Sequence, residues 1–421
     1  MSLSLLQPNS PEYEAVRRPP IPLLEERRPH AIARCRSAAD VAEALAYARR
    51  DGLAVAARSG GHCFDGRSST EGLLVDVGPM DAVSVGEGVA TIGAGARLGD
   101  VYDALDGHGL TIAGGCGPTV GISGLTLGGG LGILGRSYGL TCDQLLGAEV
   151  VLADGRVLEV SDGDLFWALR GAGGGRFGVV TRLEFRTVPA PATTTLHLRW
   201  PFEEAPAAIA AWQDFTAHAP DALAASLLVT SEVHLFGAML GTEAQTRELV
   251  RDFVASLGVE PASERLAHMG YRAAKRHLAE HGPGEEGDER VHLSKSEFFR
   301  GPLGADAIAA LVDHARDPRA TLDFSPWGGA YNRVAPDATA FPHRAERFLL
   351  KHEVAVEPRR AGAAREWLAR SWEIAHPFGT GGAYVNFPDV DLEDWDPAYH
   401  GANRERLLRV RAGYDPEGVF G

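Results

Sequence analysis

One histidine stands where a nucleophile could meet a ligand. The stretch RSGGHCFDG, residues 58–66, places His62 after two glycines and before an Asp-Gly turn. Glycines let a backbone come close to a ligand, and a neutral imidazole nitrogen can attack an electrophilic carbon. The alternative, which holds for most single histidines, is a strand-to-loop turn whose imidazole faces water.

Two glycine patterns of the form G-x-G-x-x-G occur later in the chain, at Gly130, Gly132 and Gly135 and at Gly173, Gly175 and Gly178. A Rossmann dinucleotide site requires a strand before such a pattern and a long helix after it. Gly139 interrupts the segment after the first pattern, and a strand follows the second. We therefore predict a nest of backbone N–H groups that cradles phosphate, rather than a helix terminus. A glycine-lined core turn is the alternative. The close approach would be allowed by Gly124, Gly128, Gly129 and Gly130.

The length, net charge and apolar runs of the chain argue against several classes of protein. The chain has 421 residues, enough for two or three domains, and its net charge is −15. This charge argues against nucleic acid or an anionic membrane as the main partner. No apolar run approaches membrane-spanning length, and the N-terminus lacks the basic start and apolar core of a signal peptide. We expect a cytoplasmic protein.

The cysteines indicate neither a metal site nor a disulfide framework. Their spacing matches no zinc pattern, and a chain of this length needs no disulfides to fold. We expect reduced thiols and no bound metal. The four cysteines are Cys35, Cys63, Cys116 and Cys142.

Hydrophobic periodicity predicts the elements that must position these loops. In the first part we expect helices at 37–50 and 98–109, strands at 53–57, 73–77 and 82–95, a hairpin at 147–160, and a helix, glycine loop and strand across 164–188. After 189–195 the glycine bursts become sparse, and strands alternate with longer helices such as 242–258 and 362–375. We take 189–195 as a domain boundary. The last segment, 398–421, is expected to form a helix that packs back on the first domain.

Several separated stretches together resemble one family, the berberine-bridge-enzyme-like FAD-linked oxidases. They are RSGGHCFDG at 58–66, GGCGPTVGISGLTLGGGLGILGRSYGLTCDQLLGAEVVLADG at 114–155, LFWALRGAGGGRFGVVT at 165–181, LSKSEFFRGPL at 293–303, YVNFPDVDL at 384–392, AYHGANRERL at 398–407 and YDPEGVF at 414–420. The resemblance implies an α+β fold. An FAD-binding domain of the vanillyl-alcohol-oxidase type would comprise residues 1–190, with 400–421 packing back on it. A substrate domain, an antiparallel sheet backed by helices, would comprise 191–399.

The resemblance also implies which residues hold FAD. The family joins a histidine of the R-S-G-G-H loop to the flavin 8α-methyl group, and this position is His62. Many members add a bond from a cysteine three residues before the valine of a C-x-x-V-G motif. Counted back from Val120, that position is Gly117, and Cys116 stands one residue early. We therefore expect one covalent link, through His62 and not through Cys116.

Further FAD contacts are implied for both glycine loops and for the strand after 178. Cys63 and Cys142 are interpreted as small packed residues. The implied positions are Arg58, Ser59, Gly60, Gly61, Gly117, Gly121, Gly124, Gly129, Gly130, Gly178, Val180 and Asn386.

The catalytic pair is predicted in the stretch AYVNFPD. Tyr384 and Asn386 alternate on an expected strand, so both side chains can face the same way. The resemblance implies that this segment faces the flavin. The family usually has a second tyrosine where this chain has Phe387. Tyr384 could deprotonate an alcohol if neighbours lowered its pKa. The alternative is a core tyrosine with a satisfied hydroxyl. Weaker candidates for the base are Tyr138, Tyr331 and His352.

The function implied is that of a flavin oxidase acting on a small molecule. A hydride would pass from an alcohol, sugar or amine carbon to flavin N5, and dioxygen would reoxidise the flavin and give hydrogen peroxide. The alternatives are an oxidative cyclase or a dehydrogenase with another acceptor in secondary metabolism, and a flavin-storing protein without turnover. A homodimer stays open. A nicotinamide-dependent reductase is disfavoured, because neither glycine pattern provides a Rossmann unit.

Overall fold

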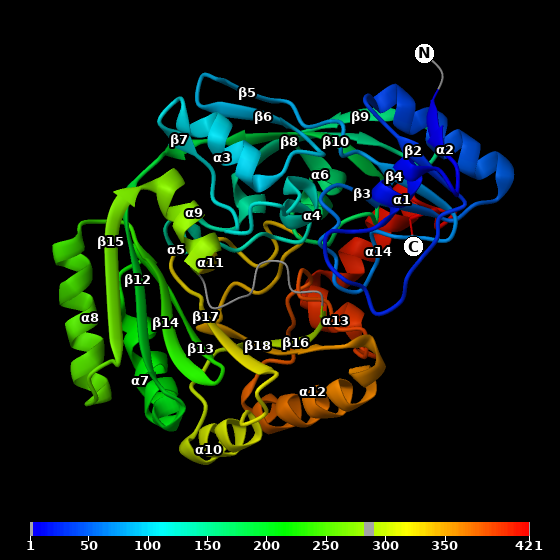
Figure 1. Ribbon diagram of the computed structural model, residues 1–421. Coiled ribbons are helices and arrows are strands. Elements are labelled where there is room, and N and C mark those ends of the chain that lie inside the picture. The colour runs from blue at the N-terminus through cyan, green and yellow to red at the C-terminus, as the bar shows by residue number, and fades with distance from the viewer. Residues whose placement is uncertain (1–2, 282–289, 421) are drawn as a thin grey trace.

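The computed structural model describes residues 3–281 and 290–420, and its first part contains two sheets (Figure 1). In the smaller sheet the strand order is β1-β2-β4-β3, with β2, β4 and β3 parallel. Its strands and helices are β1 (Ser4–Leu6), α1 (Pro11–Arg17), β2 (Ala31–Arg34), α2 (Ala38–Asp51), β3 (Val55–Arg58) and β4 (Leu73–Asp76). Helix α2 begins and ends as predicted, because Ser37 accepts a hydrogen bond from the Asp40 amide and Gly52 adopts the left-handed conformation at its end.

The second sheet is antiparallel, in the order β5-β6-β10-β8-β9. Beside it a short ladder pairs β7 with β11. Helices α3 and α6 bury apolar side chains in the core that both sheets share. The elements are β5 (Val83–Gly86), β6 (Val89–Gly93), α3 (Leu98–Asp106), β7 (Leu110–Thr111), β8 (Leu145–Val151), β9 (Val157–Val160), α6 (Gly163–Leu169), β10 (Val179–Arg186) and β11 (Val188–Pro189).

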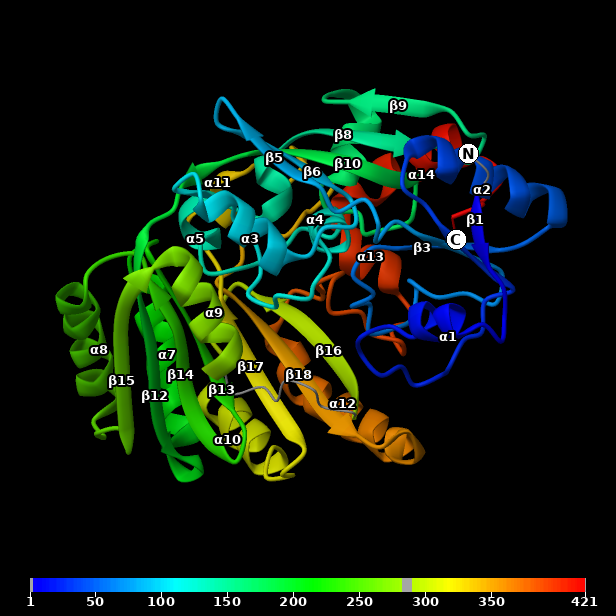
Figure 2. The ribbon, with the colours of Figure 1, turned by 45° about the horizontal axis from the view of Figure 1, so that its top comes forward.

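A seven-stranded antiparallel sheet follows, in the order β15-β12-β14-β13-β17-β18-β16. Helices α7, α8, α10 and α12 cover its outer face, while its inner face is turned toward the first part of the chain (Figures 1 and 2). The strands are β12 (Ala192–Pro201), β13 (Leu223–Val229), β14 (Glu232–Met239), β15 (Ser263–Gly270), β16 (Val291–Phe299), β17 (Ala320–Pro326) and β18 (Phe348–Val356). The helices are α7 (Ala205–His218), α8 (Glu243–Leu257), α9 (Tyr271–His281), α10 (Ala305–His314) and α12 (Ala361–Ala375).

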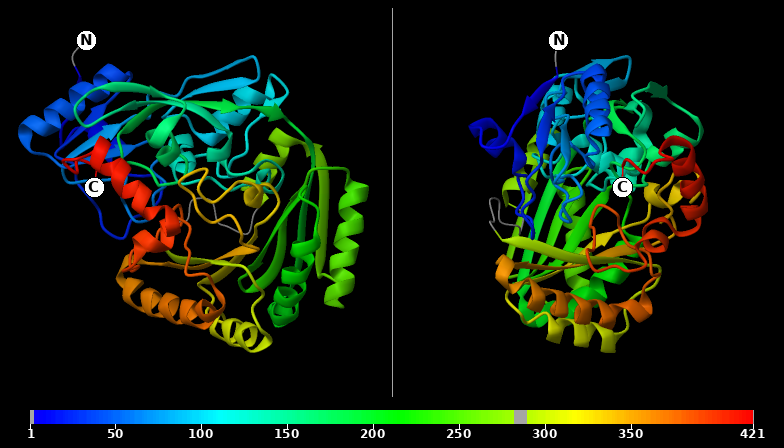
Figure 3. Two further views of the ribbon diagram at one scale, coloured as in Figure 1. Left: turned by 180° about the vertical axis from the view of Figure 1, so that it is seen from behind. Right: turned by 90° about the vertical axis from the view of Figure 1, so that its right-hand side faces the viewer.

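The C-terminal segment returns to the first part (Figure 3). Helix α14 (Arg404–Tyr414) follows α13 (Trp395–His400) and contacts α6, where the guanidinium of Arg406 pairs with Asp164 at 2.6 Å and covers the ring of Trp167. Phe420 belongs to the core shared by the first two sheets. The predicted α+β class is confirmed. The glycine loops connect elements of the first part of the chain, and the seven-stranded sheet backed by helices is a separate layer. No helix in residues 3–281 and 290–420 is both long and apolar enough to cross a membrane.

Candidate functional site

The two glycine loops touch each other. A Cβ atom on Gly60 would lie 2.2 Å from the Gly121 nitrogen, and a Cβ atom on Gly121 would lie 2.3 Å from the Gly60 nitrogen. The hydroxyls of Ser59 and Ser123 both donate to the carbonyl of Ala94, each at 2.7 Å. Only glycine permits this approach, so the two loops form one continuous backbone surface.

His62 lies on this surface and its ring is held from one side. Its Nε2 atom is 3.0 Å from Thr119 Oγ1. Burial, and then the nearby Arg97, lower the pKa of His62, so its imidazole is neutral near pH 7. When Nε2 carries the ring proton and donates it to Thr119, the lone pair is on Nδ1. In that tautomer the ring can act as a nucleophile at Nδ1.

Arg58 is buried and supports the first loop from behind. Its guanidinium donates to the carbonyls of Val16 and Arg17 at 2.8 Å and of Ser68 at 2.9 Å. These contacts fix the start of the loop to two separate segments of backbone, 16–17 and 68. Arg58 therefore orients the loop, and Gly60, Gly61 and His62 form the part of the loop that could contact a ligand.

The second glycine loop contains a short helix that sequence reasoning missed. Gly124 lies inside α4 (Ile122–Leu127), so the prediction of a nest without a helix is wrong at this position. Ile122 and Leu127 are buried, and the packing of these apolar side chains favours helical turns in this segment. A Cβ atom on Gly124 would meet nothing within 4 Å, so this side of the helix faces open space. The short helix α5 (Gly135–Tyr138) confirms that no crossover helix follows the first glycine pattern.

Gly178 directly precedes β10 and Val180 lies near its start, as the prediction of a strand there required. Val180 is buried and pairs with Val150 of β8. A Cβ atom on Gly178 would stand 2.6 Å from Val150 Cγ1. Gly178 is therefore needed for the packing of β10 on β8, whatever else its backbone contacts.

Cys116 is half-buried beside a lysine from the other part of the chain. The ammonium of Lys275, on α9, donates to the carbonyls of Gly114 at 2.5 Å and Gly115 at 2.8 Å and lies 3.7 Å from Cys116 Sγ. Burial lowers the pKa of Lys275. The lysine ties α9 to the loop that leads to Gly117. Nothing in the sequence around Lys275 signals this contact.

Tyr384 and Asn386 lie together, but in a turn rather than on the predicted strand. The Phe387 amide donates to the Tyr384 carbonyl at 2.9 Å, which closes the turn. Asn386 Nδ2 donates to the Tyr384 hydroxyl at 3.1 Å and to the Leu125 carbonyl at 3.0 Å. Pro388 follows directly and cannot donate to a strand ladder. The two side chains nevertheless meet, and Asn386 connects the phenol to α4.

The phenol of Tyr384 accepts two hydrogen bonds at its oxygen. The Gly130 amide donates at 2.9 Å, beside the donor from Asn386. Burial outweighs these donors and raises the pKa of Tyr384 to about 12. The chain alone therefore holds Tyr384 as a phenol, and the lowered pKa considered from sequence is absent without substrate and cofactor. Both donors would stabilise a phenolate once the proton leaves.

The other candidate bases lie elsewhere. His352 is on the outer side of β18, where its Nδ1 is 2.8 Å from Ser371 Oγ of α12, and burial lowers its pKa to about 3. Tyr138 lies at the surface. Tyr331 is buried in the same apolar cluster as Tyr384, with its hydroxyl 3.2 Å from the Gly132 carbonyl. His352 and Tyr138 therefore do not join Tyr384, whereas Tyr331 is its neighbour.

A charged group on the inner face of the seven-stranded sheet was missed from sequence. Lys351 and Glu353 of β18 form an ion pair, and Glu353 Oε1 lies 2.8 Å from His292 Nδ1 of β16. The Lys351 ammonium and then His292 hold the pKa of Glu353 down at about 2, against the effect of burial. The ammonium also lies 4.9 Å from the Phe387 ring. The signal was available, because two charges two residues apart interrupt the apolar strand FLLKHEVAV.

The chemistry of these groups fits the binding of FAD. Close-packed glycine backbone, the open side of Gly124 and the nucleophilic ring of His62 suit a cofactor that carries a diphosphate and an electrophilic ring. The residues that could hold it are those of the two contacting loops, 58–62 and 117–124. In residues 3–281 and 290–420 no group of His, Cys, Asp and Glu side chains could hold a metal ion.

Comparison with known proteins agrees with this geometry. The model of the FAD binding domain matches residues 29–161, and the berberine and berberine-like model matches residues 383–421. The "uncharacterized FAD-linked oxidoreductase YgaK" of Bacillus subtilis is 33% identical over 98% of this chain and 94% of its own length.

Two solved structures show the same fold. Physcomitrella patens BBE-like 1 superposes with a TM-score of 0.93 at 27% identity, covering 100% of this chain and 96% of the other. The glucooligosaccharide oxidase of Acremonium strictum, which carries a 6-S-cysteinyl, 8α-N1-histidyl FAD, superposes with a TM-score of 0.90 at 27% identity, covering 100% of this chain and 96% of the other. The chain therefore belongs to the berberine-bridge-enzyme-like family of FAD-linked oxidoreductases.

Proposed function

We propose that this enzyme is an oxidase that removes hydrogen from an alcohol carbon of a sugar-like substrate. The observation that carries the proposal is the Tyr384 hydroxyl, on which the amides of Gly130 and Asn386 converge. Bound FAD would accept the hydride at N5 and pass the electrons to dioxygen, which gives hydrogen peroxide. The chain must supply the base, the binding surface and the attachment of the cofactor.

Tyr384 would act as the base. Its phenolate form, which the two donors would stabilise, would take the proton of the substrate hydroxyl as the adjacent C–H bond breaks and would become the phenol again. Among the described residues, the phenol oxygen only accepts hydrogen bonds. Its own proton therefore has no acceptor among these residues, and loss of that proton to water would give the phenolate that acts as the base.

The inner face of the sheet would bind the substrate. The ammonium of Lys351 and the carboxylate of Glu353 lie beside the Tyr384 turn, where they can pair with hydroxyl groups. Asp323 lies on the neighbouring strand β17, at the register position opposite Lys351. A floor of charged groups favours a polyhydroxylated substrate over an apolar one, in agreement with the name of the Acremonium strictum relative.

His62 would hold the flavin through one covalent bond from Nδ1 to the 8α carbon. A C–H bond of that carbon would break, the flavin ring would take up the two electrons, and dioxygen would reoxidise the ring. The Thr119 contact at Nε2 supports this choice of nitrogen. The second bond of the Acremonium strictum enzyme has no counterpart at Gly117, and Cys116 lies next to the Lys275 ammonium. We also propose a cytoplasmic location, supported by four free cysteines.

The oxidase activity is tested with a panel of cellobiose, maltotriose, diacetylchitobiose, benzyl alcohol and benzylamine. A sugar should bleach the flavin absorbance without oxygen, and air should restore it with one hydrogen peroxide per substrate oxidised. Bleaching that is reversed only by an artificial acceptor would indicate a dehydrogenase. A flavin that no compound of the panel bleaches would contradict the proposed substrate class.

The attachment is tested by acid precipitation followed by mass spectrometry. Flavin should stay with the wild-type protein and with Cys116→Ala, and it should be released from His62→Ala. The flavin-bearing peptide should contain His62. A flavin adduct on the Cys116 peptide would show the proposed single link to be wrong.

A further inference from the structure

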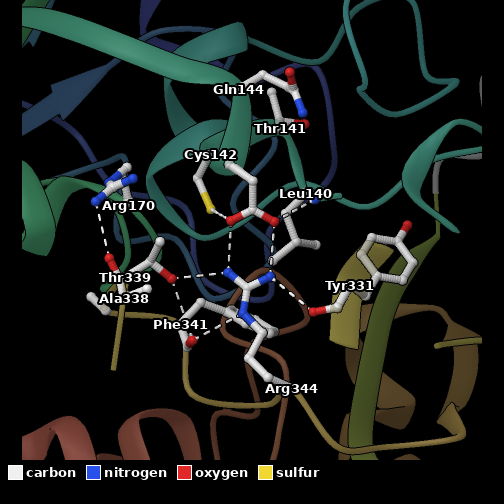
Figure 4. Close-up of polar contacts among 12 residues, drawn as sticks. Leu140, Thr141, Cys142, Gln144, Arg170, Tyr331, Ala338, Thr339, Phe341 and Arg344 are labelled. Atoms are coloured by element: carbon white, nitrogen blue, oxygen red, sulfur yellow. Dashed lines mark hydrogen bonds and ion pairs between the residues drawn. The ribbon is translucent and has the colours of Figure 1, made fainter. Parts of the chain in front are cut away.

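A buried ion pair connects the two parts of the chain close to Tyr384. Arg344, in the connection between β17 and β18, binds Asp143 of the 3-10 turn η1 (Thr141–Gln144) through two hydrogen bonds of 2.8 and 2.7 Å. Both side chains are buried, with exposed fractions of 0% and 6%. Figure 4 shows the guanidinium of Arg344 directed at this turn from the side of Thr339 and Phe341.

All three nitrogens of the Arg344 guanidinium donate hydrogen bonds within the protein. The guanidinium donates to Thr339 Oγ1 at 2.9 Å and to the carbonyls of Tyr331 and Phe341 at 3.3 Å, besides the two bonds to Asp143. A buried pair of this kind contributes little net stability compared with apolar residues of similar size. Net stabilisation is therefore a weak explanation for its presence.

The carboxylate of Asp143 orders the turn that follows Gly130. Its Oδ2 atom accepts a hydrogen bond from the Leu140 amide at 2.8 Å. The next two amides of the same turn, Thr141 and Cys142, donate at 2.9 Å to the carbonyls of Gly130 and Gly129. The pair thus fixes the turn, and the turn fixes both glycine carbonyls.

Fixing these carbonyls fixes the direction of the Gly130 amide. Gly130 has a φ of +88°, and a Cβ atom there would lie 2.2 Å from Thr141 Oγ1, so its conformation depends on glycine and on the turn. In this conformation its N–H donates to the Tyr384 hydroxyl at 2.9 Å. A continuous series of contacts therefore runs from Arg344 to the phenol.

We propose that Arg344 and Asp143 form a positioning pair that aims the Gly130 amide at Tyr384 and so sets the acidity of the phenol. The proposal rests on the proposed role of Tyr384 as the base. Both side chains are buried and bonded to protein atoms, so both act through the turn. Loss of the pair lets the amide turn away, and a phenolate with one donor fewer is less stable.

Other contacts anchor the same connection without touching the turn, and they supply the control. Trp167 Nε1 donates to the Asp337 carbonyl at 2.8 Å, and Asn403 Nδ2 donates to the Pro336 carbonyl at 2.7 Å. Trp167→Phe removes one such anchor. It loosens the attachment of residues 327–347 but leaves Asp143 and Gly130 in place.

The test compares Asp143→Asn, the double variant Asp143→Leu/Arg344→Met, Trp167→Phe and Tyr384→Phe, all as FAD-loaded enzyme. The double variant leaves no unpaired buried charge, so it should fold even if Asp143→Asn does not. Flavin reduction by the most reactive sugar of the panel is followed without oxygen across pH. Amide hydrogen exchange of the peptide that contains Gly130 is measured on the same samples.

Both pair variants should move the acidic limb of the reduction rate upward by about one pH unit. They should also exchange the Gly130 amide about tenfold faster. Trp167→Phe should change neither. An unmoved limb in folded pair variants, with Tyr384→Phe slow, would overturn the positioning role alone. Wild-type reduction by Tyr384→Phe would overturn the role of Tyr384 as the base, and the positioning proposal with it.

Discussion

Thr119 of the second glycine loop meets His62 of the first, with 3.0 Å between Thr119 Oγ1 and His62 Nε2. The contact joins residues that are far apart in sequence, and the direct approach of Gly60 to Gly121 brings it about. It holds the imidazole at Nε2, and in the tautomer that donates from Nε2 the lone pair is on Nδ1. The contact between the two loops therefore holds the His62 ring in place within the chain itself.

Replacement of Thr119 by valine should slow the covalent attachment of FAD. The side chain keeps its shape but loses the hydroxyl, and a hydrogen bond worth about 1 kcal/mol corresponds to a rate roughly fivefold lower. The covalent fraction is measured over time by acid precipitation after FAD is added to apoprotein. Thr119→Ser keeps the hydroxyl and should attach flavin at nearly the wild-type rate. Equal rates for the valine and serine variants would contradict a role for this contact.

Gly121→Ala and Gly124→Ala should separate folding from cofactor binding. The new methyl at Gly121 would lie 2.3 Å from the Gly60 nitrogen, so this variant should lose several kcal/mol of stability and its FAD. The methyl at Gly124 meets nothing within 4 Å in the chain itself. Gly124→Ala should therefore melt as apoprotein like the wild type but bind FAD more weakly. Wild-type FAD affinity of Gly124→Ala would show that this side of α4 does not face the cofactor.

Tyr384→Phe should slow anaerobic flavin reduction by roughly 10²–10⁴-fold, the usual contribution of a general base. FAD content and the reaction of reduced enzyme with oxygen should hardly change, because neither uses this proton transfer. Tyr331→Phe is the matched control, since it removes another buried hydroxyl in the same cluster. Fast reduction by Tyr384→Phe together with slow reduction by Tyr331→Phe would transfer the role to Tyr331.

Much of the fold could be predicted because local signals agree with the final structure. Ser37 and Gly52 mark both ends of α2, and alternating apolar residues mark β10. Tyr384 and Asn386 lie together, although the strand expected there is a turn. Local pattern favours a strand for YVNF, whereas the preference for a turn comes from Pro388 and from contacts of Asn386 with distant backbone.

The contacts between distant segments could not be predicted. Lys275 lies in an unremarkable helical stretch, and only the packing of α9 brings its ammonium to Gly114. Arg344 and Asp143 are about 200 residues apart, and nothing near either residue signals a pair. His352 illustrates the converse, because the alternation along β18 sends it to the outer face while Lys351 and Glu353 point inward.

His352 should make the enzyme less stable in acid. Burial lowers the pKa of His352 to about 3, whereas an unfolded histidine titrates near 6.5. The unfolded chain therefore binds more protons between these values, so the contribution is complete above pH ~6.5 and is lost as the pH falls toward 3. The slope is about 1.4 kcal/mol for each pH unit. The buried His343 and His400, with pKa values lowered by burial to about 4 and about 3, add to it.

His352→Gln should reduce this slope, whatever it does to the free energy of unfolding at pH 7. The free energy is measured by urea denaturation at a series of values between about pH 4.5 and pH 6.5, and the expected decrease in slope is about 1.4 kcal/mol per pH unit. His218→Gln is the control, because it removes an exposed imidazole at the end of α7. A wild-type slope in His352→Gln would mean that His352 keeps its proton in the folded enzyme, despite the apolar packing of α12 against β18.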